Sequence, residues 1–133
     1  MDPVLRLVSD ARRLRSEVEN PFDRDAVIEY FCGLADEMGF TPAKHVRRNG
    51  ASVDCAWKDR NEIFLAMNVE FGSEREILGA AAQVVASGAE VGVLVTASNP
   101  LKPMHNAETA IRALKREVFV IIDVRDGKSR VIQ

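Results

Sequence analysis

The chain has 133 residues and a mass of 14.7 kDa, and its 47% hydrophobic and 29% charged residues are the ordinary balance of one globular domain with a sizeable core. No apolar run reaches the roughly 18 residues that a membrane-spanning helix needs, and no signal-peptide pattern is visible, so we expect a cytoplasmic protein without a membrane partner. A net charge of −2 argues against general nucleic-acid binding, because nonspecific affinity comes from Lys and Arg.

Two amphipathic helices are predicted ahead of the first strand. From Pro3 to Glu19 the apolar residues recur at steps of three and four, which places them on one face and the arginines on the other. The second helix is expected to use Asp23 as its N-cap, to run to Met38 and to stop at Gly39. Each helix therefore has one face to bury.

Three strands joined by short turns come next, over residues 43–48, 53–57 and 63–71. Asn49-Gly50 is a two-residue hairpin signal because both residues tolerate a positive φ angle. The turn-like residues 58–61 connect the second and third strands. The pattern therefore predicts three consecutive antiparallel strands.

Asp54, Asn68 and Glu70 are polar residues within these otherwise apolar strands. Side chains alternate along a strand, so Asn68 and Glu70 share a face, and a hairpin brings Asp54 close to them. Carboxylates that lie close together repel each other unless a cation lies between them. Because Mg²⁺ prefers oxygen ligands, the three residues predict a divalent-metal site.

The second half of the chain alternates helices with strands. Ser73 and Glu76 form a capping-box pattern that opens a helix ending at Ser87. Turns are expected at Asn99-Pro100 and at Pro103. The remaining predicted elements are a buried strand over 91–95, a helix over 107–117, and strands over 118–124 and 129–133. This order predicts an α/β fold with a mixed sheet and helices on both faces.

An acid on one strand, a polar triplet on the next strand and a following helix resemble the motif of the PD-(D/E)xK nucleases. The resemblance covers about residues 21–98 of a single domain, 1–133, and it implies a restriction-endonuclease-like fold. It further implies that Asp54, Asn68 and Glu70 are catalytic, and that Asp54 and Glu70 hold Mg²⁺ or Mn²⁺. A metal-bound water would then attack a phosphodiester of DNA.

Two registers fit the triplet, and each departs from the family pattern. Asn68-Val69-Glu70 has Asn at the acid position and Glu at the lysine position, whereas Glu70-Phe71-Gly72 has Gly72 at the lysine position. Arg75, in the next helix, is a candidate to supply the positive charge of the missing lysine. Because an amide ligates a hard cation only weakly, the alternative is a nuclease fold that has lost catalysis and binds DNA or protein.

The residues expected to contact DNA are Lys44, Arg47, Arg48, Arg75 and Gln83. A second basic cluster contains Arg12, Arg13 and Arg15, and Glu29 is a candidate extra acid on the second helix. Each of these charges also fits a plain solvated surface.

The cysteines and the absence of two catalytic motifs bear on the other possible functions. Cys32 and Cys55 are interpreted as small buried hydrophobes, with no disulfide and no metal-ligand spacing to the histidines. A glycine-rich phosphate loop and a nucleophile elbow are both absent, which disfavours an enzyme acting on small molecules. A homodimer is expected, because cutting both strands of a duplex with one site per subunit requires two subunits.

Overall fold

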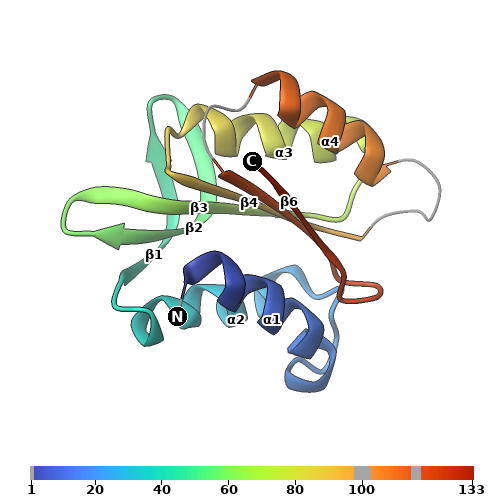
Figure 1. Cartoon of the computed structure of the whole chain (residues 1–133), viewed down its shortest axis with the longest axis horizontal. Helices are drawn as coiled ribbons and strands as arrows, with labels where there is room; N and C mark the ends of the chain where they lie inside the picture. Colours follow the sequence, from blue (N-terminus) through green and yellow to red (C-terminus); the bar gives the residue numbers. More distant parts are fainter. Residues whose placement is uncertain (1, 98–102, 115–117) are drawn as a thin grey trace.

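Six strands form one mixed sheet that lies between two pairs of helices in the computed structural model, which describes residues 2–97, 103–114 and 118–133 (Figure 1). The helices are α1 (Pro3–Glu17), α2 (Arg24–Glu37), α3 (Glu74–Ala86) and α4 (Pro103–Leu114). The strands are β1 (Thr41–Arg48), β2 (Ala51–Asp59), β3 (Glu62–Glu70), β4 (Val91–Thr96), β5 (Val118–Asp123) and β6 (Ser129–Ile132). The predicted single α/β domain with a mixed sheet is confirmed.

The strands lie in the sheet in their order along the chain, from β1 to β6. The strands β3, β4 and β5 are parallel, and the other neighbouring pairs are antiparallel. Their register sets Glu70 opposite Thr96 and Thr96 opposite Asp123. The carboxyl ends of the parallel strands therefore meet at one edge of the sheet, where ligands commonly bind in open α/β folds.

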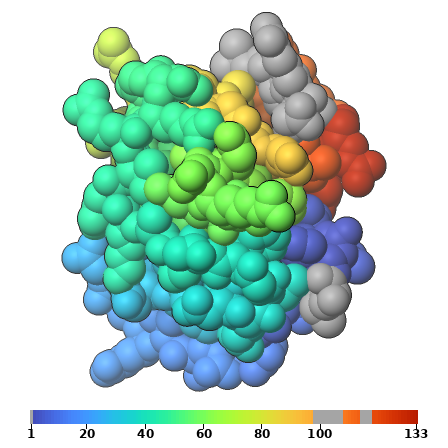
Figure 2. Space-filling model, turned by 90° about the vertical axis from the view of Figure 1, so that its left-hand side faces the viewer, coloured from blue at the N-terminus to red at the C-terminus, as the bar shows by residue number. Residues whose placement is uncertain are grey.

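Each face of the sheet has its own apolar core. Residues of α1 and α2 pack with Cys55, Trp57, Leu65 and Val93 on one face. Residues of α3 and α4 pack on the opposite face with a second set that includes Phe119. Figure 2 shows the end of the molecule where β2 and β3 (green) lie above the α2 region (blue to cyan).

Most predictions from local sequence agree with the structure. Asn49 and Gly50 adopt φ angles of 54° and 77° in the turn between β1 and β2. Asp23 caps α2, and Ser73 and Glu76 form the predicted capping box of α3. The predicted start of α4 was wrong, because this helix begins four residues earlier, at Pro103. The expected turn at Asn99-Pro100 and helix end at residue 117 lie outside the described residues.

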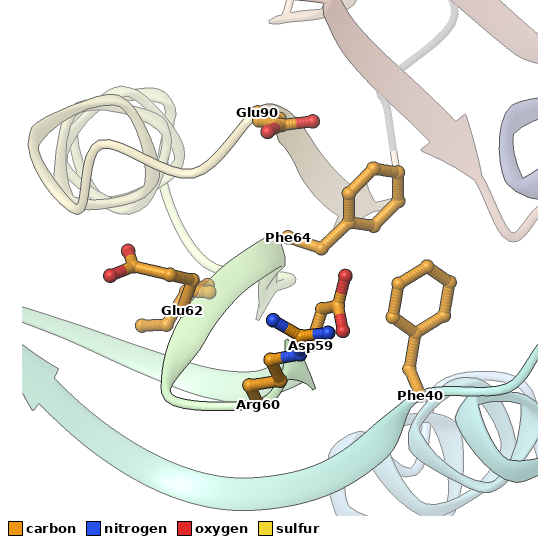
Figure 3. A pocket seen from close by; sticks show the side chains of 7 residues that line it. Phe40, Asp59, Arg60, Glu62, Phe64 and Glu90 are labelled. Atoms are coloured by element: carbon orange, nitrogen blue, oxygen red, sulfur yellow. The ribbon is translucent and has the colours of Figure 1, made fainter.

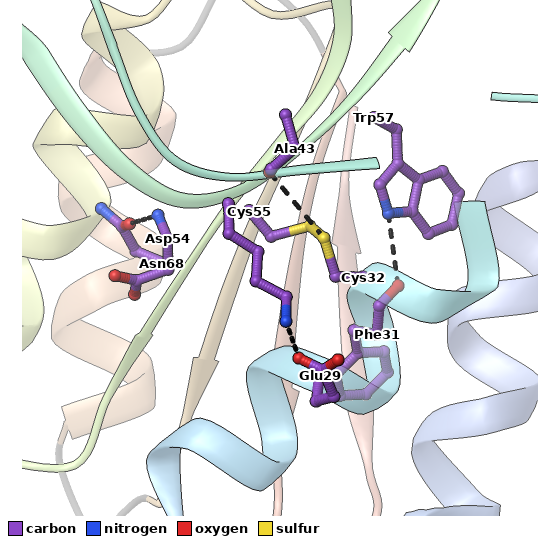
Figure 4. Close-up of a disulfide and its surroundings, with 9 residues drawn as sticks. Glu29, Phe31, Cys32, Ala43, Asp54, Cys55, Trp57 and Asn68 are labelled. Atoms are coloured by element: carbon purple, nitrogen blue, oxygen red, sulfur yellow. Dashed lines mark hydrogen bonds and ion pairs between the residues drawn. A yellow bond between two sulfur atoms is a disulfide. The ribbon is translucent and has the colours of Figure 1, made fainter. Parts of the chain in front are cut away.

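The two cysteines are buried as predicted, but the expectation that they form no disulfide was wrong. Cys32 of α2 and Cys55 of β2 form a disulfide, with their Cα atoms 5.9 Å apart (Figure 4). Sequence spacing alone gives no sign of this bond, because it depends on how α2 docks on the sheet. Both cysteines are at most 2% exposed, so the bond links the helix to the sheet inside the core. No helix in the described part of the chain is long and apolar enough to cross a membrane.

Candidate functional site

The predicted polar residues lie where β2 and β3 separate. The ladder between these strands extends from Asp59–Glu62 to Cys55–Met67, and side chains connect the strands beyond it. The backbone N–H of Asp54 donates to Asn68 Oδ1 at 2.8 Å, and the backbone N–H of Val69 donates to Asp54 Oδ2 at 2.8 Å. Asp54 and Asn68 thus take the place of backbone partners (Figure 4).

Asn68 uses both ends of its side-chain amide. Besides the bond from Asp54, Nδ2 donates to the carbonyl of Ser52 at 3.2 Å and to the carbonyl of Ala80 at 3.0 Å. The residue is 6% exposed. A buried amide with these three partners fixes β2, β3 and α3 to one another, since leaving any of the groups unpaired is costly.

Arg24, the first residue of α2, completes this arrangement. Its Nη2 donates to Asp54 Oδ1, and its Nε donates to the carbonyl of Val69 at 2.9 Å. The planar guanidinium presents its donors as a fork, so one side chain contacts a carboxylate and a carbonyl together. These two oxygens are of the kind that a hard cation takes as ligands. An arginine cation is therefore already bonded to them.

Glu70 has a local partner. Its Oε2 accepts a hydrogen bond from the backbone N–H of Gly72 at 3.1 Å. Two residues further on, α3 begins, and the hydrogen bonds from the backbone N–H and hydroxyl of Ser73 hold the pKa of Glu76 below its usual value. Among the side chains that the structure describes, no group of three or more His, Cys, Asp or Glu residues is arranged to hold a metal ion.

Of the five residues expected to contact DNA, three have side-chain partners within the protein and two have no carboxylate partner among the described residues. Lys44 and Arg48 of β1 form ion pairs with Glu29 and Glu62, respectively, the second at 3.2 Å. Arg47 and Arg75 are exposed and free of carboxylate partners among the described residues. Gln83 of α3 accepts a hydrogen bond from the backbone N–H of Ser52 at 2.8 Å. Several of the predicted contacts therefore already have partners within the protein.

The sequence did not identify Arg24 as part of the site. The Asp23 N-cap predicts that a helix begins here, but nothing local connects its first residue to a carboxylate 30 positions later. The contact arises because α2 crosses the sheet with its N-terminus at the edge where β3 ends.

An open hollow of about 500 Å³ lies at the other end of β3 (Figure 3). Phe40 and Phe64 stack at its wall with ring centroids 4.6 Å apart. Its charged lining residues are Asp59, Arg60, Glu62 and Glu90. Because Glu62 begins β3 and Asn68 lies near the end of that strand, the hollow is separate from the polar cluster.

Comparison with known proteins adds no identification. No protein-family model, no curated protein and no solved structure matches this chain.

Proposed function

We propose that the protein is a DNA-binding module with a restriction-endonuclease-like architecture that binds DNA without cutting it. The order of elements, with Asp54 on β2, Asn68 and Glu70 on β3 and a helix following, supports this kind of fold. The observation that carries the loss of catalysis is the bonding of Arg24 to Asp54 and to the carbonyl of Val69. A monovalent guanidinium at this point balances the carboxylate but has no coordination position for a water nucleophile.

Asn68 supports the same conclusion. Its Nδ2 hydrogens point to two carbonyls, and its Oδ1 accepts from a backbone N–H. Asn68 therefore offers no carboxylate oxygen to a metal ion. The acid that the nuclease motif requires is replaced by an amide whose hydrogen bonds hold the fold together.

A metal-dependent endonuclease is the second candidate, and one observation favours it. The Arg24 side chain is 47% exposed, whereas the Asp54 side chain is 12% exposed. A half-exposed arginine has room to move toward solvent, which would leave Asp54 and Glu70 for Mg²⁺ or Mn²⁺.

Calorimetric titration with Mn²⁺ separates the two candidates. The wild type is expected to show no binding heat, whereas Arg24→Ala, which frees two oxygens, is expected to gain Mn²⁺ binding. The matched control is Arg75→Ala, which removes an exposed cation from α3 and should behave like the wild type. Adding Asp54→Asn to Arg24→Ala should abolish the gained heat.

Nicking of supercoiled DNA tests activity directly. We expect no nicks from the wild type with either metal. Wild-type heat with Mn²⁺ together with metal-dependent nicking would establish the endonuclease and overturn our proposal.

The predicted cytoplasmic location and homodimer remain proposals. The disulfide makes the location testable, because disulfides persist in oxidising compartments and are rare in a reducing cytosol. Alkylation of thiols in freshly lysed cells measures whether Cys32 and Cys55 are bonded there.

A further inference from the structure

Gly127 brings the turn between β5 and β6 onto the C-terminal half of α1. Its φ angle is 72°, and a Cβ added to it would lie 3.0 Å from the carbonyl oxygen of Ala11 and 3.1 Å from the Cα of Arg12. A residue with a side chain would be strained by both the backbone conformation and this close approach. Only glycine therefore lets the turn lie directly against the helix.

A second contact joins the same two segments. Arg15 of α1 donates from Nη1 to the carbonyl of Arg125 in the turn. This bond uses the charged end of Arg15 without neutralising it, because a carbonyl carries no net charge. Figure 1 shows the turn (red) beside the end of α1 (blue).

The two contacts gather four exposed cations that are far apart in the sequence. We name them the α1–turn patch: Arg12, Arg15, Arg125 and Lys128. Among the described residues, none of the four has a carboxylate partner.

The neighbouring charges leave the patch positive. Arg13 lies beside it but is engaged by Asp10 and Glu17. The acid within the turn is Asp126, whose Oδ1 accepts a hydrogen bond from the backbone N–H of Lys128 at 2.9 Å. Asp123, at the end of β5, adds a second carboxylate, whose Oδ1 accepts a hydrogen bond from the backbone N–H of Arg125 at 2.9 Å. The four cations still outnumber these two carboxylates, whereas Lys44 and Arg48 of β1 are both ion-paired.

The patch lies at the edge of the sheet that also carries the polar cluster. The turn follows Asp123, which stands in register with Thr96 and, through it, with Glu70 at the end of β3. Arg24 contacts the carbonyl of Val69 at the same edge. The patch therefore lies at the same end of the sheet as the polar cluster.

We infer that the α1–turn patch binds the phosphate backbone of duplex DNA. This inference rests on the proposed function, since it names the surface through which the module contacts its DNA. Free Lys and Arg side chains supply the affinity for phosphates. Duplex is favoured over single-stranded DNA because the four residues include no aromatic side chain on which unstacked bases would stack.

The test is the salt dependence of binding to a short labelled duplex, measured by fluorescence anisotropy in EDTA so that cleavage plays no part. With about 0.9 counterions released per phosphate contact, four contacts predict an affinity loss of about 150-fold between about 50 and 200 mM salt. Removing two contacts in Arg125→Gln/Lys128→Gln should reduce that loss to about 12-fold. The charge-matched control is Lys58→Gln/Arg60→Gln, which removes two cations where the β2–β3 hairpin turns, away from the patch, and should keep the wild-type dependence.

A variant that should bind DNA more tightly separates a loss of patch contacts from a loss of binding through misfolding. Asp126→Asn keeps an oxygen that accepts from the N–H of Lys128 but removes the negative charge, so it should tighten binding. Circular dichroism of all variants should match the wild type.

Several results would overturn the inference. The first is an equal reduction of the salt dependence in the patch and control variants. The second is tighter binding of a single-stranded oligonucleotide than of the duplex, and the third is no duplex binding at about 50 mM salt. Nicking by the wild type in Mg²⁺ would overturn the absence of catalysis instead and leave the patch result standing, so the two failures are distinguishable.

Discussion

Breaking the disulfide between Cys32 and Cys55 is expected to lower the free energy of unfolding by about 3.4 kcal/mol. The bond closes a loop with a sequence separation of 23 residues. In the chain-entropy model, such a crosslink removes about 11.4 cal/mol/K of entropy from the unfolded chain, which gives the stated value near 298 K. With an unfolding entropy of about 0.28 kcal/mol/K for 133 residues, the midpoint of thermal unfolding should fall by about 12 °C.

Urea unfolding of the oxidised and the reduced protein measures this difference. Trp57 is the one tryptophan of the chain, is fully buried and donates its indole N–H to the carbonyl of Phe31 at 3.2 Å, so its fluorescence reports loss of the core. Because the disulfide is buried, the reductant must equilibrate with the protein through the unfolded state. A Cys32→Ala/Cys55→Ala variant should be insensitive to the reductant and serves as the control.

Two results would refute this reasoning. The first is an unchanged urea midpoint for the wild type after complete reduction. The second is the alkylation of two thiols in the denatured, unreduced protein, which would show that the bond does not form.

Three further predictions follow from other contacts. Burial, aided by the nearby charge of Asp10, raises the pKa of Tyr30 to about 12, so the folded state favours the neutral phenol. The contribution of Tyr30 to the free energy of unfolding is therefore complete below pH 10 and is lost as the pH rises through about 12. Tyr30 is the only tyrosine, so the absorbance of tyrosinate should titrate near 12 in the folded protein and near 10 in urea; equal midpoints would contradict the prediction. Asn68→Asp should cost at least about 2 kcal/mol in urea unfolding, because the carbonyls of Ser52 and Ala80 lose their donors; a variant as stable as the wild type would contradict the observed bonds. Finally, if two copies associate, light scattering should give about twice the 14.7 kDa of one chain, and a monomer at all concentrations would remove the predicted homodimer.

Features that depend on neighbouring residues were predictable from the sequence. The turn at Asn49-Gly50 follows from the tolerance of those two residues for a positive φ angle, and the capping box of α3 follows from Ser73 and Glu76 three positions apart. The apolar run over 91–95 correctly predicted a strand buried on both faces, since β4 is buried at every position. Helix and strand types therefore needed no tertiary information.

Features that depend on docking between elements were not predictable. The contact of Arg24 with Asp54 and the disulfide between Cys32 and Cys55 both require that α2 lie across β2 at one particular angle. The α1–turn patch likewise joins Arg15 to Arg125 across 110 residues. Apolar periodicity indicates which face of a helix is buried, but not which polar side chain its end brings to a strand.

The local structure of β2 and β3 explains why polar residues occur in these apolar strands. Once the strands separate beyond Cys55 and Met67, the backbone N–H groups of Asp54 and Val69 and the carbonyl of Ser52 lack partners across the pair, and buried backbone groups of this kind must be satisfied. A metal ion could contact carbonyl oxygens but could not accept hydrogen bonds from the two N–H groups, which need the oxygens of Asp54 and Asn68.

The side chains that are present serve both kinds of group. Asp54 accepts from the N–H of Val69, Asn68 accepts from one N–H and donates to two carbonyls, and Arg24 donates to the carbonyl of Val69. An aspartate at position 68 would accept but not donate, so the choice of asparagine follows from the carbonyls that need donors. The polar cluster is therefore explained by the hydrogen bonds of the fold, which need no metal ion.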